Sequence, residues 1–174
     1  MKIRKLKQKD IPYMLEWMHD YSVVENLQTD FLNKTYENCN DFIKQACQSD
    51  EANLHRAITD DNDEYMGTIS LKHIMFGSAE FAITIRKVAM GKGYSKFGMA
   101  EMLNYGFEKL NLDFVYWCVS KENKRARRFY EKNYFLTFYP KQNVELLKII
   151  QRNQYTSEQI EDYIWYKVQN ICKF

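Results

Sequence analysis

Hydrophobic and polar positions alternate cleanly along residues 79–86. Every odd-numbered residue from Ala79 to Ile85 is apolar, whereas the even-numbered positions begin with Glu80 and end with Arg86. Because side chains of a strand point to opposite faces in turn, this period of two predicts a strand with one well-covered face. The other face carries polar groups that are available for chemistry.

The remaining expected strands are shorter or less regular. Residues 114–120 are apolar or aromatic on both faces, which predicts a central strand covered on both sides. Residues 54–59 and 65–74 flank the acidic run 60–63, which predicts a hairpin with a solvated turn rather than a metal site. Further strands are expected at 2–8, 134–139 and 163–168.

Helical spacing of apolar residues predicts the elements between the strands. Ile11, Met14 and Met18 keep this spacing over 11–19, with Asp10 in the N-cap position. Further helices are expected at 36–47, from the glycine segment to Lys109, at 123–132 and at 144–152, and a capping box runs from Thr156 to Gln159. With no repeat or boundary, we expect one mixed α/β domain over 1–174.

Composition narrows the class of protein. The chain has 174 residues, of which 45% are hydrophobic and 16% aromatic, and this excludes a disordered protein. The net charge of +2 gives no general reason for a nucleic-acid partner. The four cysteines lack Cys-x-x-Cys spacing and the three histidines are isolated, so we expect no metal. Without an apolar run that could span a bilayer or form a signal peptide, a cytoplasmic protein with reduced thiols is expected.

Glycine is scarce in the chain and concentrated at one place. Only six glycines occur, and Gly91, Gly93 and Gly98 fall within eight residues between an expected strand and an expected helix. Such a loop favours phosphate binding, because glycine admits close approach and free N–H groups stand at the helix start. The P-loop and dinucleotide patterns both fail, since Met99 follows Gly98 and position 96 is lysine. A tight turn with a helix packing contact is the alternative.

The helix expected at 123–132 has a strongly basic face. Residues 121–132 contain six basic and two acidic side chains, while Ala126, Phe129 and Tyr130 share the apolar face. This pattern fits either a solvated helix face or a landing site for an anionic ligand near the glycine loop. Tyr130 taken alone is typical of a core residue.

Together these segments resemble the GNAT (general N-acetyltransferase) superfamily. The strand at 79–86 is similar to its central strand, and Gly91-Lys92-Gly93-Tyr94 is similar to its pyrophosphate loop. The run from Asn123 through Tyr130 to Phe135 resembles its second cofactor motif. The branch most resembled contains ribosomal-protein N-terminal, spermidine and nucleotide-amino-sugar acetyltransferases. The resemblance implies a single, mostly antiparallel twisted sheet of about six or seven strands with helices on both faces.

Three positions depart from the family pattern. Val88 and Met90 stand where the family has side chains directed at phosphate, although the backbone donors remain. Asn133 stands where glycine is common, but asparagine tolerates the left-handed conformation of a helix C-cap, so this change is mild. We expect an active enzyme in spite of these departures.

The resemblance implies direct transfer of an acetyl group from acetyl-CoA to a primary amine. Tyr130 would protonate the departing CoA thiolate, and Glu80 would take a proton from the amine, directly or through water. Backbone N–H groups of 85–88 would stabilise the oxyanion. Contacts to the pantetheine arm would come from Ile85, Arg86, Lys87, Val88 and Asn123, and contacts to the pyrophosphate from Gly91, Lys92, Gly93, Tyr94 and Ser95. The 3′-phosphate would meet Lys124, Arg125 or Arg128.

Several alternatives stay open at this level. Glu80 either has its pKa raised by partial burial, as a base requires, or forms a salt bridge at the strand end. Cys118 is expected to pack rather than to act as a nucleophile. The acceptor is a small amine or a nucleotide-linked amino sugar, and segment 141–162 either shapes the acceptor side or forms a homodimer contact. The rival functions are a non-catalytic acyl-CoA-binding module and a nucleic-acid-binding protein that uses the 121–132 face.

Overall fold

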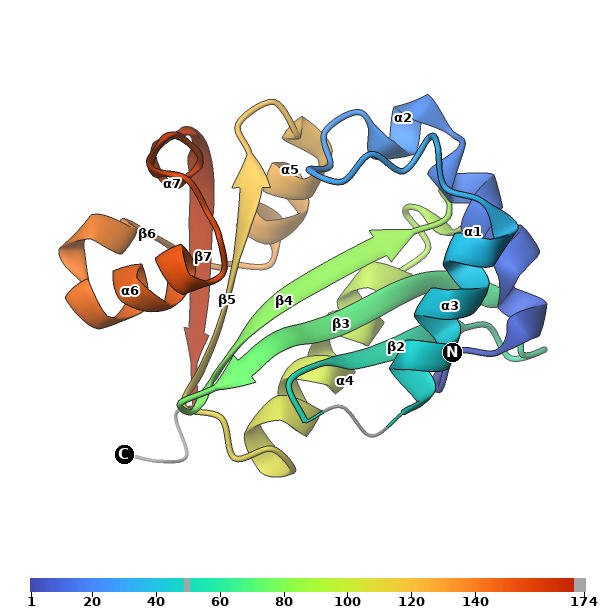
Figure 1. Ribbon diagram of the computed structural model, residues 1–174, viewed down its shortest axis with the longest axis horizontal. Coiled ribbons are helices and arrows are strands. Elements are labelled where there is room, and N and C mark those ends of the chain that lie inside the picture. Colours follow the sequence, from blue (N-terminus) through green and yellow to red (C-terminus); the bar gives the residue numbers. More distant parts are fainter. Residues whose placement is uncertain (49–50, 171–174) are drawn as a thin grey trace.

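A single seven-stranded sheet forms the centre of the protein (Figure 1), whose computed structural model describes residues 1–48 and 51–170. The strand order is β1-β2-β3-β4-β5-β7-β6, and all neighbours pair antiparallel except β4 and β5. This confirms the expected mostly antiparallel sheet. The strands are β1 (Lys2–Arg4), β2 (Leu54–Thr59), β3 (Tyr65–Met75), β4 (Ser78–Ile85), β5 (Phe114–Ser120), β6 (Thr137–Phe138) and β7 (Tyr163–Gln169).

Helices cover both faces of the sheet, as expected (Figure 1). The helix after the glycine segment packs behind the sheet on an apolar core that includes Ile69, Leu71 and Phe81. The N-terminal helices and the helices before β7 cover the opposite face. The helices are α1 (Ile11–Met18), α2 (Tyr21–Val24), α3 (Tyr36–Cys47), α4 (Tyr94–Glu108), α5 (Lys124–Lys132), α6 (Val144–Arg152) and α7 (Ser157–Asp162), with short 3-10 turns at Gln8–Asp10, Lys87–Ala89 and Pro140–Gln142.

The helix ends differ in detail from the sequence pattern. Asp10 stands in the expected N-cap position of α1, but its buried carboxylate makes no capping bond and instead accepts hydrogen bonds from the Arg4 guanidinium and from the Lys7 N–H. After α5, the left-handed residue is Tyr134, with φ of 60°, whereas Asn133 has φ of −98°. The chain therefore turns one residue after the position where the family commonly has glycine.

The parallel pair β4–β5 opens into a wedge. The two strands pair only where Ser78–Glu80 lie beside Phe114–Tyr116. Farther along, β4 continues beside β3 and β5 continues beside β7, so the two central strands diverge (Figure 1). The second half of β4 therefore has an edge that no neighbouring strand of the described residues occupies.

An insert between β6 and β7 covers one side of this wedge. It contains the 3-10 turn at Pro140–Gln142 followed by α6 and α7. Its apolar residues pack on Tyr116 and Trp165 of the sheet, and the Asn153 amide donates to the Tyr116 hydroxyl. The capping box predicted from Thr156 to Gln159 is confirmed at the start of α7.

Candidate active site

A cavity of about 220 Å³ occupies the wedge between β4 and β5. We call it the wedge cavity; its lining includes Glu80, Trp117, Cys118, Asn123, Tyr130 and Tyr155. These side chains come from β4, β5, α5 and the insert, which are far apart in the sequence. The structure thus brings the two residues expected to be catalytic, Tyr130 and Glu80, into one cavity together with Asn123.

Tyr130 reaches the wedge cavity from the apolar face of α5. Asn123 caps this helix by accepting a hydrogen bond from the Ala126 N–H, as its sequence position suggested. The Tyr130 ring packs against Trp117 and Tyr166, and burial raises the pKa of its phenol. The phenol therefore stays protonated at neutral pH. Among the described residues, no partner forms a hydrogen bond with its hydroxyl, which is thus available to a ligand.

Glu80 is buried in the wall of the wedge cavity as an ion pair. Its Oε1 lies 2.9 Å from Lys72 Nζ and accepts a hydrogen bond from the Tyr155 hydroxyl at 2.9 Å. Its Oε2 lies 3.1 Å from His73 Nδ1. Burial raises the pKa of this carboxyl, but the bonds from His73, Lys72 and Tyr155 outweigh it, so the pKa lies below its usual value. The expected raised pKa is wrong, and the alternative of a salt bridge is confirmed.

Tyr155 is a cavity residue that sequence reasoning did not identify. It lies between α6 and α7, and its hydroxyl lies 3.5 Å from Cys118 Sγ as well as next to Glu80. Burial raises the pKa of the Cys118 thiol to about 12, so this thiol stays protonated and is not a nucleophile at neutral pH. The only signal in the sequence was the 141–162 segment itself, which was expected either to shape the acceptor side or to form a homodimer contact.

The glycine loop has the geometry of an anion site. Gly91 and Gly93 have φ of 75° and 89°, a conformation that favours glycine, and α4 begins directly after them with 15 residues. The first N–H groups of a helix have no acceptor within it and carry partial positive charge. Arg125 extends across from α5, with Nη1 lying 3.2 Å from Met90 Sδ. The basic helix therefore lies beside the loop, as the landing-site interpretation requires.

The segment that follows β4 differs from expectation. The strand ends at Ile85 and residues Lys87–Ala89 form a 3-10 turn, so the backbone of 85–88 that was expected to serve the cofactor and the oxyanion is not a continuous strand. The Arg86 N–H donates to the Met66 carbonyl, which leaves it unavailable to a pantetheine arm or an oxyanion. Because successive residues of a strand direct their backbone groups to alternate edges, the Ile85 N–H faces the wedge.

The basic side chains of this segment are held by carboxylates. Arg86 is 5% exposed, donates to Glu16 and Glu64, and stacks over the Tyr13 ring at 4.4 Å. Lys87 Nζ lies 3.2 Å from Asp20, although its side chain is largely exposed. Any contact of Arg86 or Lys87 with a cofactor would thus have to come from the remaining backbone groups.

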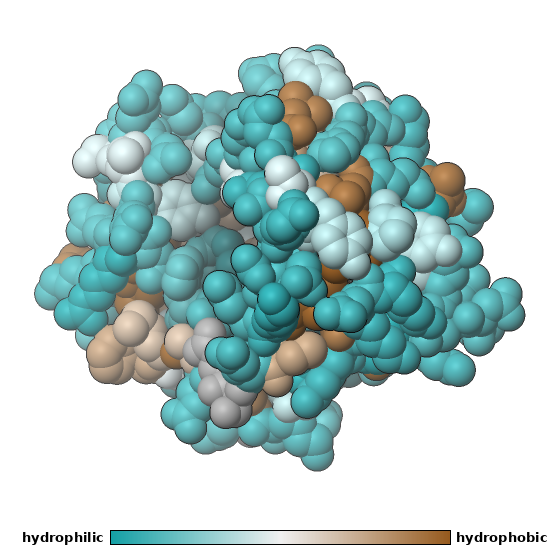
Figure 2. Space-filling view, turned by 45° about the vertical axis from the view of Figure 1, so that its right-hand side comes forward, coloured by the Kyte–Doolittle hydropathy of each residue, from teal (hydrophilic) through white to brown (hydrophobic). Residues whose placement is uncertain are grey.

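A second chamber adjoins the wedge cavity on the same face of the sheet. This outer chamber has a volume of about 370 Å³, and its lining includes Trp17, Phe31, Lys34, Phe42, Ser70 and Thr84. Phe31, Ala82 and Thr84 line both spaces, so the two adjoin along the polar face of β4. Figure 2 shows a recess on this side of the molecule, bounded mostly by hydrophilic residues.

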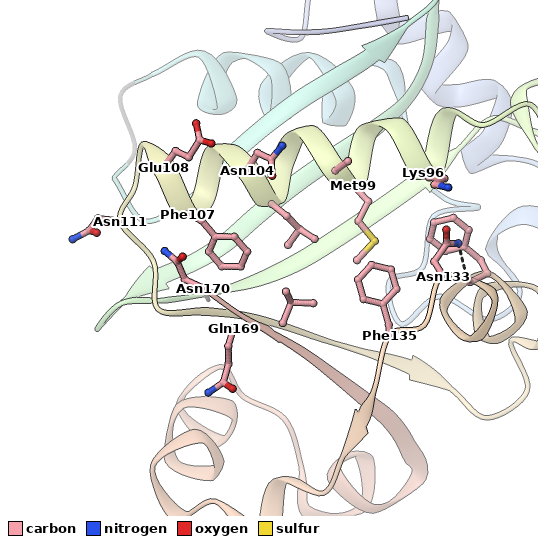
Figure 3. A pocket seen from close by; sticks show the side chains of 14 residues that line it. Lys96, Met99, Asn104, Phe107, Glu108, Asn111, Asn133, Phe135, Gln169 and Asn170 are labelled. Carbon is pink, nitrogen blue, oxygen red and sulfur yellow. Dashed lines mark hydrogen bonds between the residues drawn. The ribbon is translucent and has the colours of Figure 1, made fainter. Parts of the chain in front are cut away.

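A larger hollow, of about 800 Å³, lies on the opposite face of the sheet, along α4. Figure 3 shows Met99, Phe107 and Phe135 directed into it, with amide side chains such as Asn104 and Asn170 around its rim. It contains neither Glu80 nor Tyr130. We assign no chemistry to this apolar space.

The wedge, the glycine loop at a helix start and a protonated tyrosine between them define an acyltransferase that uses a CoA thioester. The sequence model of the acetyltransferase (GNAT) domain matches residues 1–135, and the chain belongs to this family. Acetyltransferase PseH of Campylobacter jejuni is 22% identical over 134 residues, covering 77% of this chain and 82% of the relative. Spermidine N(1)-acetyltransferase of Vibrio cholerae is 27% identical over 134 residues, covering 75% of each.

Solved structures agree with this fold. A crystal structure of Vibrio cholerae spermidine N-acetyltransferase in complex with CoA and spermine has a TM-score of 0.74, with 19% identity over 97% of this chain and 94% of that chain. An acetyltransferase of the GNAT family from Bacillus anthracis has a TM-score of 0.70 with 18% identity, covering 96% of this chain and 93% of that one. The protein is an N-acetyltransferase with acetyl-CoA as its acetyl donor.

The described residues contain neither a metal-binding cluster nor a membrane-spanning helix. Within residues 1–48 and 51–170, no group of three or more His, Cys, Asp or Glu side chains could hold a metal ion. Over the same ranges, no helix combines the length and the apolar character needed to cross a membrane. Cys39, Cys47 and Cys118 are free thiols, and Cys172 lies outside the described residues.

Proposed function

We propose that acetyl transfer occurs in the wedge cavity, with the amine entering from the outer chamber. The observation that carries this proposal is the convergence of Tyr130, Glu80 and Asn123 on the opening between β4 and β5. The acetyl group would lie between the unpaired edge of β4 and Tyr130. The amine would approach along the polar face of the sheet, where Glu80 lies.

The cofactor would run from this point to the glycine loop. Backbone groups of Ile85 on the open edge of β4 pair with the pantetheine arm, as an added strand would, and Asn123 faces the same arm. The N–H groups of residues 91–95 bind the pyrophosphate at the start of α4. Arg125 and Arg128 on the exposed face of α5 bind the remaining phosphate.

The chemistry requires balanced proton movements. The neutral amine attacks the thioester carbonyl, the C–S bond breaks, and the CoA sulfur takes the proton of the Tyr130 phenol. The nitrogen of the adduct loses a proton through Glu80 to water, and the Tyr130 phenolate regains a proton from water. Because the pKa of Glu80 lies below its usual value, Glu80 accepts this proton only in passing and mainly orients the N–H group. No acetylated enzyme is formed, in keeping with the raised pKa of the Cys118 thiol.

The acceptor is proposed to be a small molecule with a primary amine. Its access route passes through the outer chamber, which lies within the size range of small-molecule sites. One of the relatives is a spermidine N(1)-acetyltransferase, which is consistent with a small amine. A cytoplasmic location belongs to the same proposal, on the ground of the free thiols of the described cysteines.

Acceptor-dependent release of CoA tests this function. The full chain is incubated with acetyl-CoA and single amines from a panel of amino sugars, phosphorylated amino sugars, polyamines and peptides. We expect at least one small amine to accelerate CoA release and to appear as its acetylated product. If CoA binds and no amine accelerates its release, the chain is an acyl-CoA-binding module and the enzyme proposal is wrong. Salt-sensitive binding of nucleic acid without acetyl transfer would favour the rival that uses the face at 121–132.

A further inference from the structure

The outer chamber presents positive rather than negative charge to an acceptor. Its lining contains Lys34 and Lys72 but no aspartate or glutamate. Lys72 is paired with Glu80, the one carboxylate in the lining of the adjoining wedge cavity. Lys34 is half-buried, and no carboxylate among residues 1–48 and 51–170 lies within ion-pair distance of it. A half-buried ammonium group without a counter-ion attracts an anionic ligand group.

The same arrangement disfavours a polyamine as acceptor. A polyamine brings several ammonium groups into the chamber, where they meet the ammonium group of Lys34, which has the same charge. Glu80 cannot offset this repulsion fully, because it already pairs with Lys72 and His73. Like charges brought together in a site disfavour a ligand. The chamber therefore selects against polycations even though one relative is a spermidine N(1)-acetyltransferase.

The walls of the outer chamber match a ring with one apolar face and a hydroxyl rim. On one side, Trp17, Phe31 and Phe42 from the N-terminal half supply aromatic surface. On the other, the sheet supplies the hydroxyls of Thr68, Ser70 and Thr84 in neighbouring positions of β3 and β4. Each hydroxyl offers one donor and two acceptor sites, so a partner within the protein still leaves capacity for a ligand.

We infer that the acceptor is an amino sugar that carries an anionic group, a phosphate or a carboxylate, which pairs with Lys34. This inference rests on the proposed function, since it names the acceptor of the same site. The sugar ring lies between the aromatic and hydroxyl walls of the outer chamber, and its amine points toward Glu80 and Tyr130. A phosphate and a carboxylate both pair with an ammonium group, so Lys34 can bind either one. The sugar ring distinguishes the inferred acceptor from simple amino acids.

Matched acceptors test the inference. The full chain is assayed with acetyl-CoA and glucosamine, glucosamine 6-phosphate, an amino uronic acid, glycine or spermidine, and kcat/KM is measured for each. We expect kcat/KM for an anionic amino sugar to exceed that for neutral glucosamine by about tenfold or more, the range for a hydrogen bond to a charged group. The phosphate and uronate arms distinguish the two anions, and glycine reports a carboxylate without the ring. Equal values for anionic and neutral sugars, or a preference for spermidine or glycine, would overturn the inference.

Variants of Lys34 locate the effect. Lys34→Gln should reduce the ratio of anionic to neutral kcat/KM to near one, mainly by raising the KM of the anionic sugar, and Lys34→Glu should invert the ratio. Lys44→Gln, an exposed lysine of α3 that pairs with Asp41, is the matched control and should keep the wild-type ratio. Acetyl-CoA binding, measured in every variant, verifies folding. An unchanged ratio in Lys34→Gln would contradict the inference, whereas turnover of neutral glucosamine alone would still support the proposed function.

Discussion

Two buried tyrosines allow catalysis and stability to be separated. Replacing Tyr130 by phenylalanine removes a hydroxyl that has no hydrogen-bond partner among the described residues, while the ring contacts with Trp117 and Tyr166 remain. We therefore expect the free energy of unfolding to change by no more than about 0.5 kcal/mol. The same substitution removes the proposed proton donor of the reaction and should lower kcat about 10²-fold, which corresponds to about 2.7 kcal/mol of transition-state stabilisation.

Tyr65→Phe is the reciprocal control. The Tyr65 side chain is fully buried, and its hydroxyl accepts a hydrogen bond from Trp17 Nε1 at 3.0 Å and bonds with Thr68 Oγ1 at 2.6 Å. Its loss leaves the indole N–H of Trp17 without its acceptor, at a cost of about 1–3 kcal/mol. For a chain of this size, each kcal/mol lowers the Tm by about 2–4 °C.

Stability is measured by urea unfolding, and turnover is measured by chromatographic detection of CoA. The exposed thiol of Cys47 does not disturb the chromatographic measurement. The two variants should show opposite profiles, with Tyr130→Phe stable and slow and Tyr65→Phe less stable and still active. Wild-type turnover in Tyr130→Phe would remove the phenol from the mechanism. A stability loss above about 1 kcal/mol in Tyr130→Phe would show that its hydroxyl serves the fold.

Three further predictions concern charged residues. The pKa of Glu80 is lowered from its ordinary 4.5, so the charged carboxylate stabilises the folded state above that pH, and this stabilisation is lost as the pH falls through the folded pKa. The loss of unfolding free energy in Glu80→Gln, measured by urea unfolding, should thus be larger at pH 7 than at pH 3. Arg86→Lys should lower the unfolding free energy by about 1–2 kcal/mol, because a lysine ammonium cannot keep both guanidinium bonds to Glu16 together with the other contacts of the guanidinium group. An unchanged urea midpoint would contradict this. Arg125→Gln should raise the KM for acetyl-CoA about 3–10-fold, with Lys132→Gln at the far end of α5 as control, and equal KM values would exclude the phosphate contact.

The periodicity of apolar residues predicted the bounds of most elements to within one or two residues. This is because burial of one face of an element determines both its sequence pattern and its place in the fold. The expected bounds of the strands at Leu54–Thr59 and Phe114–Ser120 are confirmed, as are those of the helix at Tyr36–Cys47. The edge strand expected at 134–139 shrinks to Thr137–Phe138. Tyr134 adopts a left-handed conformation and Pro140 begins a 3-10 turn, so backbone geometry at both ends shortens the pairing.

The electrostatics of the site could not be predicted in the same way. Alternation placed Glu80 on the polar face of its strand, but its pKa depends on which side chains stand across the sheet. The hairpin register puts Lys72 directly opposite Glu80, and a shift in that register next to it turns His73 toward the same carboxylate. Arg86 likewise has the sequence position of a contact to the pantetheine arm, whereas its side chain pairs with Glu16 of α1 and with Glu64, which lie far from it in the sequence.

The family match covers one half of the candidate site, and the insert between β6 and β7 supplies a residue of the other half. The family match ends at residue 135, and the wedge, the glycine loop and Tyr130 all lie within it. Tyr155 lies beyond it, yet its hydroxyl donates to Glu80 and contacts Cys118 inside the wedge cavity. Under the proposed function, changes in the insert should therefore alter the surroundings of the amine while the cofactor half keeps its geometry. We infer that acceptor choice can vary through this segment, whose sequence carries no cofactor motif.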